Sequence, residues 1–234
     1  MIQFENKEEQ IINTSQDIYD SFNNLIFSND IKVLGKFISK VKLLEQVKDI
    51  PGDIVECGVF KGSGILSWLK IKKILQPNSF KKVIGFDYFD TDNLLGSLEG
   101  DDKYKMEKLF NTRNFEHNEE FVNLLDDKIK NCGFNSADFE LIKGDISNTS
   151  FDFVAKRPGF KISLLYLDLD LKTPTYNVLS AFWDRVSRGG IVVFDEYAYH
   201  QWSESMGVDK FFEDKNIVVK TLDYNAPTAY VIKP

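Results

Sequence analysis

The sequence has few cysteines, few arginines and no long hydrophobic run, and each shortage excludes a class of protein. Its two cysteines, Cys57 and Cys132, have no metal-ligand spacing, and 234 residues bury a core without disulfides or structural zinc. Arginine occurs only at positions 113, 157, 185 and 188, and the net charge is −7. Neither nucleic acid nor an anionic membrane surface is therefore an expected partner.

Two further absences concern location. The apolar runs are much shorter than the ~20 residues of a membrane-spanning helix. The polar N-terminus carries no secretory signal. We therefore expect a cytoplasmic protein without a membrane span.

What is present is typical of one folded domain. Hydrophobic residues make up 43% of the chain and aromatic residues 14%, which excludes intrinsic disorder. Residues 8–50 repeat apolar side chains at helical spacing, and a Pro-Gly turn at 51–52 ends that region. We expect a single domain over residues 1–234, with a helical cap over 1–50 whose apolar faces suit a homodimer, and a core over 51–234.

Short apolar runs alternate with helical segments in that core. Strands are expected at residues 54–57, 83–86, 139–142, 162–169, 191–194, 217–222 and 229–232, and helices at 64–75, 118–130, 149–155, 175–186 and 205–213. This alternation predicts an α/β, doubly wound, Rossmann-like seven-stranded sheet that is mostly parallel. Only residues 223–227 separate the last two runs, which predicts a C-terminal antiparallel hairpin. An insertion near residues 96–113 is expected to form a loop that serves as a lid or binds substrate.

A glycine-rich turn follows the first expected strand. Gly58, Gly62 and Gly64 lie between this strand and a helix. Such a turn lets a ligand approach the backbone, and the helix N-terminus favours a polar or anionic group. The spacing is not GxGxxG, and a tight turn without a ligand is the alternative.

Acidic residues follow the next two strands. Asp87 ends the second strand, where an acid in doubly wound folds accepts hydrogen bonds from ribose hydroxyls; a helix N-cap is the alternative. Asp145 follows the third strand and either binds an adenine amino group or caps a helix. With the glycine turn, these two acids indicate a nucleoside-containing cofactor.

Three more acids end the fourth and fifth strands. Asp168 ends the fourth strand, and Asp195 and Glu196 end the fifth. Adjacent parallel strands lie ~4.8 Å apart, so these carboxylates are expected to converge at one edge. Clustered carboxylates raise one another's pKa unless a cation neutralises them, and oxygen ligands suit Mg²⁺ or a similar divalent cation. The alternative is that Asp195 and Glu196, like Asp170, cap helices or face solvent.

As an ordered set, these motifs resemble class I S-adenosylmethionine-dependent methyltransferases, and specifically the macrocin O-methyltransferase (TylF-like) family, which methylates sugar hydroxyls in natural-product pathways. The resemblance covers about residues 51–212 and is carried by residues 51–62, 85–87, 142–145, 167–171, 174–175 and 189–197. The chain has Asp195-Glu196 where relatives commonly carry two aspartates. Its turn at 62–64 reads Gly-Ser-Gly where relatives often have Gly-Gly-Ser.

The resemblance implies both a cofactor site and a metal site. In the cofactor site Glu56 and Gly58 would flank the methionine part, Asp87 the ribose and Asp145 the adenine. The full set implied for S-adenosylmethionine is Glu56, Cys57, Gly58, Val59, Phe60, Gly62, Ser63, Asp87, Asp145, Ile146 and Asp168. The set implied for Mg²⁺ or a similar divalent cation is Asp168, Asp195 and Glu196.

The expected reaction is an in-line displacement of the sulfonium methyl by a hydroxyl of a sugar or sugar-containing small molecule. Asp168 is the expected general base, and His200, just past the metal acids, is the competing candidate. Three alternatives stay open: a catechol or phenol acceptor, an NAD-dependent dehydrogenase, and a non-catalytic nucleoside-binding module.

Overall fold

The protein folds around one seven-stranded sheet in the order β3-β2-β1-β4-β5-β7-β6. The computed structural model describes residues 4–114, 117–224 and 226–234. Strands β1 to β5 are parallel to one another, whereas β7 is antiparallel to both β5 and β6. The strands are β1 (Asp53–Cys57), β2 (Val83–Asp87), β3 (Phe139–Lys143), β4 (Ile162–Leu167), β5 (Val186–Phe194), β6 (Lys220–Thr221) and β7 (Ala229–Ile232). The predicted fold class, including the C-terminal antiparallel strands, is confirmed.

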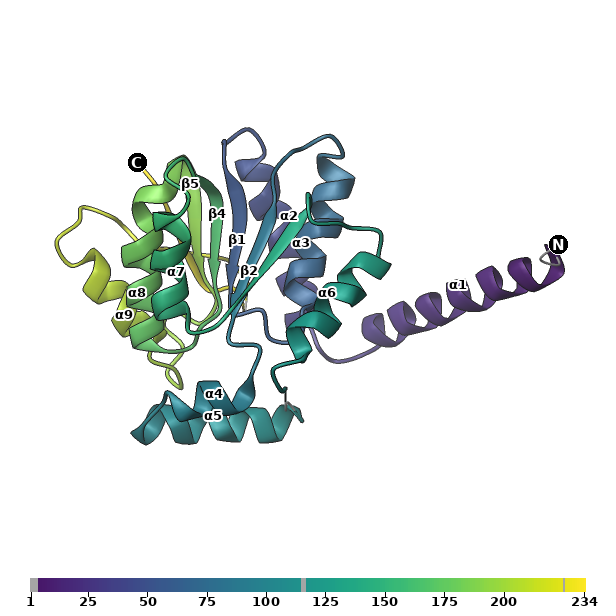
Figure 1. Ribbon diagram of the computed structural model, residues 1–234, viewed down its shortest axis with the longest axis horizontal. Coiled ribbons are helices and arrows are strands. Elements are labelled where there is room, and N and C mark those ends of the chain that lie inside the picture. The colour runs from purple at the N-terminus through teal and green to yellow at the C-terminus, as the bar shows by residue number, and fades with distance from the viewer. Residues whose placement is uncertain (1–3, 115–116, 225) are drawn as a thin grey trace.

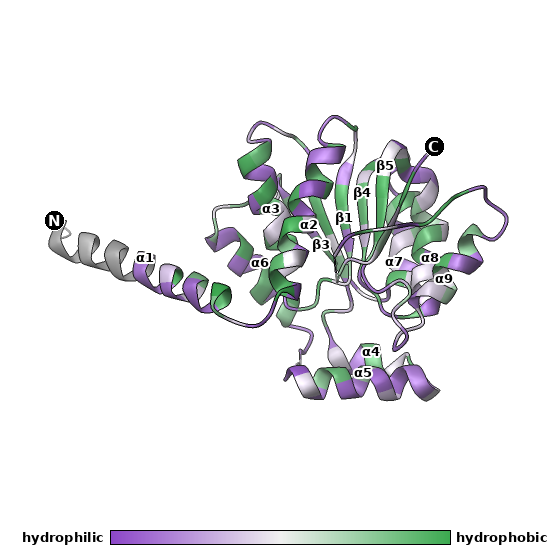
Figure 2. Cartoon of the chain, turned by 180° about the vertical axis from the view of Figure 1, so that it is seen from behind, coloured by the Kyte–Doolittle hydropathy of each residue, from purple (hydrophilic) through white to green (hydrophobic). Residues whose placement is uncertain are grey.

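Helices cover both faces of the sheet (Figure 1). The helices on one face are α2 (Lys32–Val47), α3 (Ser63–Leu75) and α6 (Phe121–Asn131), and those on the other are α7 (Ile146–Ala155), α8 (Lys172–Phe182) and α9 (Glu204–Phe212). Each face has its own buried core, because side chains along each strand alternate between the two sides. The hydrophobic residues accordingly gather in the strands and on the inner sides of these helices (Figure 2).

The first helix, α1 (Phe4–Ile26), extends away from the sheet (Figure 1). Of the two N-terminal helices, α2 therefore covers the core. The apolar side chains Ile18 and Phe22 on α1, and Val33 and Phe37 on α2, are exposed. Among the described residues, no helix combines the length and apolar character of a membrane span.

The insertion near residues 96–113 is helical, so the prediction of a loop is wrong. It forms α4 (Thr91–Gly96) and α5 (Gly100–Arg113), which lie beyond the carboxyl ends of the strands (Figure 1). Helix α5 packs Met106 and Phe110 against Leu171, which follows β4. Two buried apolar positions on a 14-residue helix are too few for a periodic signal in the sequence.

Several other element boundaries also differ from prediction, most clearly around β5 and β6. The helix expected at 175–186 ends four residues early, because a 3₁₀ turn (Trp183–Arg185) intervenes and β5 already begins at Val186. The strand expected at 217–222 is reduced to β6. Residue 225, in the predicted hairpin turn, lies outside the described residues.

Helix α2 is held on the sheet by apolar contacts and by one fully buried ion pair. Leu43, Leu44 and Val47 belong to the core on this face. Lys40 Nζ lies 2.9 Å from Glu56 Oε1, and the two side chains are only 4% and 3% exposed. Burial lowers the pKa of Lys40 and raises that of Glu56, so each charge depends on its partner.

We expect Lys40→Met to lower the free energy of unfolding by about 3–5 kcal/mol, because it leaves a carboxylate buried without its cation. The double variant K40M/E56Q is expected to recover most of this loss, since an amide carries no charge and still accepts from Trp68 Nε1. Lys105→Met removes an i,i+4 ion pair with Asp101 on the surface and is the matched control, with a change of at most ~0.5 kcal/mol. Urea unfolding measures the wild type, these three variants and the single variant E56Q; a double variant as unstable as the sum of its two single changes would contradict the coupling.

Candidate functional site

Side-chain alternation places the acids at the strand ends on the face that α2 covers. Leu167 and Phe194, the last residues of β4 and β5, belong to the core on the opposite face. Asp168 and Asp195 come directly after them and therefore point to the α2 side. Glu56, the penultimate residue of β1, points to the same side and contacts α2. The three carboxylates thus share one side of the carboxyl edge.

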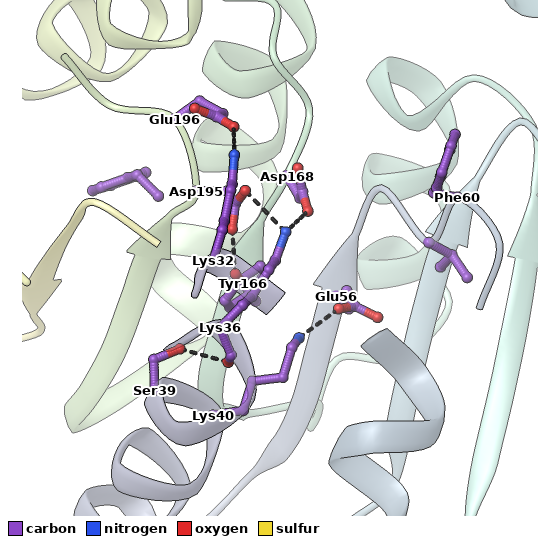
Figure 3. A network of polar contacts seen from close by, with 12 residues as sticks. Lys32, Lys36, Ser39, Lys40, Glu56, Phe60, Tyr166, Asp168, Asp195 and Glu196 are labelled. Atoms are coloured by element: carbon purple, nitrogen blue, oxygen red, sulfur yellow. Dashed lines mark hydrogen bonds and ion pairs between the residues drawn. The ribbon is translucent and has the colours of Figure 1, made fainter. Parts of the chain in front are cut away.

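Three lysines of α2, at positions 32, 36 and 40, stand one helical turn apart and reach these acids (Figure 3). We call this set the lysine ladder. The pairs are Lys32 with Glu196 at 3.1 Å, Lys36 with Asp168 at 2.7 Å and with Asp195 at 2.9 Å, and Lys40 with Glu56 at 2.9 Å. Each acid in this set therefore has a cation from the same helix.

Lys36 joins the ends of β4 and β5. Its ammonium contacts Oδ2 of both Asp168 and Asp195, and the Tyr166 hydroxyl donates to the other oxygen of Asp195. The side chain of Asp195 is 2% exposed, whereas those of Lys36 and Asp168 are 29% and 28% exposed. Asp195 is therefore sealed inside, and the other two can meet a ligand.

The charges of this group depend on one another. Burial, with the charge of Asp168 adding to it, raises the pKa of Asp195 to about 6. Burial alone would lower the pKa of Lys36, but the charges of Asp168 and Asp195 outweigh it and raise that pKa. Lys36 consequently stays protonated and acts as a fixed positive charge, not as a base.

Two other acids, the half-buried Asp170 and the buried Glu204, lie next to this group. Burial and the neighbouring carboxylates raise the pKa of Asp170 and of Glu204 well above the usual range. Glu204 Oε1 accepts a hydrogen bond from the backbone N–H of Glu196 at 3.1 Å. Lys32 and Lys36 form their ion pairs with Asp168, Asp195 and Glu196 and not with these two acids. The prediction missed Glu204, since it lies one residue before the helix expected at 205–213, which was inferred from periodicity alone.

The glycines of the turn after β1 are required by contacts inside the protein. Gly58 has a φ of +92°, and a Cβ there would lie 1.9 Å from the backbone oxygen of Asp168. A Cβ at Gly64 would lie 2.1 Å from Glu56 Oε1. Gly62, with a φ of +90°, faces a side chain of α6. The glycines therefore bring the strand ends together and do not by themselves identify a ligand.

Asp87 holds that turn in place. Its Oδ2 accepts from the backbone N–H groups of Val59 at 2.8 Å and Phe60 at 2.9 Å, and its Oδ1 accepts from Phe89 at 3.0 Å. Burial raises its pKa, while these backbone donors oppose the rise. Contact between Asp87 and a ribose stays a prediction.

Asp145 occupies the N-cap of α7. Its Oδ1 accepts from Ser147 N at 2.9 Å, and its Oδ2 accepts from Asn148 Nδ2 at 3.1 Å. The capping alternative is thus present in the structure. Ile146, the first residue of α7, is buried. Contact between this segment and an adenine stays a prediction.

The other residues implied for the cofactor differ in accessibility. Cys57 is fully buried in the core on the opposite face, and Val59 is buried on the α2 side. Their side chains are therefore not accessible to a ligand, and contact between these residues and a cofactor stays a prediction. Ser63, the first residue of α3, is exposed. His200 is exposed in the loop after β5, where its ring lies 5.2 Å from that of Tyr199.

The acids do not fit a divalent cation in this arrangement. Both Oδ2 atoms that would bind it already accept from Lys36, and Glu196 accepts from Lys32. An ion bonded to the Asp168 oxygen at about 2.1 Å would lie within about 5 Å of the Lys36 ammonium. Their repulsion is roughly 7 kcal/mol at an effective dielectric constant of 20. Within the described ranges, no group of three or more potential ligands is placed to hold a metal.

The lysine ladder is what the sequence prediction missed. The pattern was available, because lysines at 32, 36 and 40 repeat every four residues and so share one side of a helix. The prediction considered only the apolar residues of this helix, including Phe37 and Ile38, and proposed that the apolar faces of the cap suit a homodimer. In the structure both of these are exposed, and the lysines of this first part of the helix point inward.

Comparison with known proteins places this geometry in context. The macrocin O-methyltransferase (TylF) family model matches residues 8–226. The apo structure of CalS11, a TDP-rhamnose 3'-O-methyltransferase of calicheamicin biosynthesis, is similar with a TM-score of 0.65 and 25% identity, covering 90% of this chain and 84% of that one. The O-methyltransferase NovP has a TM-score of 0.66 and 20% identity, covering 85% and 79%. No curated protein sequence gives a significant match.

The family match spans nearly the whole chain and includes β1 to β5, α2 and the insertion. It removes the NAD-dependent dehydrogenase and the non-catalytic module from the alternatives. The fold that CalS11 and NovP share with this chain agrees with that conclusion. The chain belongs to the macrocin O-methyltransferase (TylF) family and is an O-methyltransferase.

Proposed function

We propose that this enzyme transfers a methyl group from S-adenosylmethionine to a hydroxyl of a sugar or sugar-containing small molecule, such as a nucleotide sugar or a glycosylated natural product. The observation that carries the proposal is the pair of Asp168 and Lys36, a partly exposed carboxylate beside a fixed cation at the carboxyl edge. The family match and the TDP-rhamnose activity named for CalS11 support a sugar as acceptor.

A cofactor with an ammonium group fits the inner part of this edge. Glu56 Oε2 is buried and, within the part of the chain that the structure describes, accepts no hydrogen bond. It lies against the first turn of α3, beside Gly64. The ammonium of the methionine moiety would supply the missing donor. Asp87 and Asp145, which fix the neighbouring loops, are proposed to meet the ribose and the adenine.

Proton removal from the acceptor is the task of Asp168 in this proposal. S-adenosylmethionine, when bound, supplies an electrophilic methyl group and keeps the electron pair of the broken carbon–sulfur bond. Asp168 accepts the hydroxyl proton as the new carbon–oxygen bond forms, which typically contributes ~10²–10⁴-fold in rate. The backbone around Gly58 holds Asp168 against β1 and so fixes its position. No step is assigned to a divalent cation, because the residues implied for it are bonded to lysines.

We propose that the acceptor binds between the insertion helices α4 and α5 and the carboxyl edge of the sheet. Met106 and Phe110 form a small apolar cluster with Leu171, and Phe60 and Trp202 pack against it from the loops after β1 and β5. This cluster joins the insertion to loops that carry Asp168 and the acids of β5. Its apolar surface suits the carbon face of a sugar, while the carboxylates meet the hydroxyls.

The homodimer expected from the sequence also stays a proposal. Exposed apolar side chains on α1 and on the outer side of α2, including Ile18, Phe22 and Phe37, support it, because a second copy would remove them from water. The cytoplasmic location is likewise an expectation.

Asp168→Asn is expected to lower the turnover number at least ~100-fold, because an amide cannot accept the hydroxyl proton. Affinity for S-adenosylhomocysteine is expected to change little. His200→Asn is the matched control and is expected to keep near wild-type turnover. Turnover is measured by transfer of a labelled methyl group, and affinity by calorimetry. Wild-type turnover in D168N, or its loss in H200N, would contradict the choice of base.

A panel of acceptors tests the substrate class. With labelled S-adenosylmethionine, we expect methyl transfer to nucleotide sugars or glycosylated natural products. We expect at least ~100-fold lower kcat/KM with catechols, because their two hydroxyls lie in the plane of a flat ring and do not match the hydroxyl positions of a puckered sugar ring. The products are identified by mass spectrometry. Transfer to catechols alone would replace the sugar by the phenol alternative.

A further inference from the structure

We propose that Lys36 is the cation of the acceptor site, and that the enzyme transfers the methyl group without a bound divalent cation. The proposal rests on the proposed function for its chemistry, and on the lysine ladder for its geometry. It assigns the role that a metal ion would have to a side chain of this protein.

The position of the Lys36 ammonium is the first argument. It lies 2.7 Å from Asp168 Oδ2 and 2.9 Å from Asp195 Oδ2, so it bridges the ends of two neighbouring strands. A lysine ammonium has three N–H donors, and these two contacts use two of them. The side chain is 29% exposed, so the third donor can reach an acceptor oxygen placed beside Asp168. A base and a positive charge are thereby next to the same hydroxyl.

The rest of the ladder holds Lys36 in this position. Lys40, one turn later, is buried between the rings of Trp68 and Tyr166, with its Nζ 4.1 Å from each ring centroid. Lys32, one turn earlier, is paired with Glu196. Contacts on both sides fix the register of α2 against the strands. The ammonium is therefore preorganised, which is the condition for strong electrostatic stabilisation of a transition state.

The chemistry balances without a metal. The acceptor O–H bond breaks and its proton moves to Asp168, while the oxygen forms a bond to the methyl carbon and the electron pair of the carbon–sulfur bond stays on sulfur. Negative charge develops on the acceptor oxygen during this step, and the third N–H of Lys36 donates a hydrogen bond to it. Lys36 is paired with carboxylates on both strands, so it acts in this step as a hydrogen-bond donor and not as a proton acceptor.

A divalent cation and Lys36 compete for the same oxygens. Asp195 has no spare position to offer, because its other oxygen accepts from Tyr166 and its side chain is sealed from solvent. Removing the ammonium would leave two carboxylates side by side, which is a suitable start for a metal site. The structure therefore predicts that loss of Lys36 creates metal binding that the wild-type protein lacks.

Mn²⁺ binding, followed by electron paramagnetic resonance in the presence of S-adenosylhomocysteine, tests this without any acceptor. We expect no saturable binding to the wild type up to about 1 mM and saturable binding to Lys36→Met. Turnover of the wild type is expected to be unchanged by EDTA or added Mg²⁺, and K36M is expected to lose at least ~100-fold. Lys42→Met, at an exposed position of the same helix, is the control and is expected to behave as wild type in both measurements.

Lys36→Arg is a second variant that keeps the positive charge and can be tested if K36M does not fold. We expect it to exclude Mn²⁺ as the wild type does. Saturable Mn²⁺ binding to the wild type, loss of its turnover in EDTA, or wild-type turnover in K36M would each overturn the proposal. A wild type that excludes Mn²⁺ but methylates no acceptor of the panel would refute the proposed function and leave the competition between lysine and metal standing.

Discussion

Neutralisation of the acids at the carboxyl edge by one helix is the constraint on which the rest of this structure depends. The parallel sheet places Asp168 and Asp195 on adjacent strands and turns both to the same side. Two carboxylates so close cannot both ionise without a nearby cation. Helix α2 supplies that cation as Lys36, and its neighbours in the ladder pair with Glu56 and Glu196. The charge balance of the site is thus decided by how α2 packs on the sheet.

This dependence joins the stability of the domain to its chemistry. The Lys40–Glu56 pair is buried among aromatic rings and fixes α2, while Lys36 lies one turn away at the solvent edge. A change that shifts α2 along its axis therefore moves the charge beside the proposed base. The exposed apolar side chains on α1 and on the outer side of α2 belong to the same region of the chain. A second copy of the protein packed on them would therefore contact the helix that carries Lys36.

Much of this could be predicted from the sequence, because strands of a parallel sheet leave a clear signal. The runs ending at Asp87, Asp168 and Asp195 identified three strands of the parallel sheet, and the structure confirms that the strands before Asp168 and Asp195 are neighbours. Helix α5 escaped prediction, since it buries only Met106 and Phe110. The turn glycines indicated a ligand or, alternatively, a tight turn. The structure shows that Gly58 is needed for close approach to Asp168, which follows β4, and contact with a ligand stays a prediction.

The larger error of the sequence prediction was that it did not identify the lysine ladder as the partner of the acids. Periodicity says which residues share a side of a helix, but not which side faces the protein, and in the first half of α2 the lysines face inward. The acids on the sheet decide which side faces inward. Burying a carboxylate without a cation costs more free energy than leaving an apolar side chain exposed to water. The lysine pattern of α2 could therefore be interpreted only together with Asp168 and Asp195, which lie more than a hundred residues further along the chain.

A crystal structure of the enzyme with S-adenosylhomocysteine, grown in Mg²⁺, tests most directly whether the cation at the strand ends is Lys36. We expect its ammonium to lie within about 3 Å of one oxygen of Asp168 and one of Asp195, with no metal between them. An ion at about 2.1 Å from those oxygens, with Lys36 turned away, would contradict this assignment.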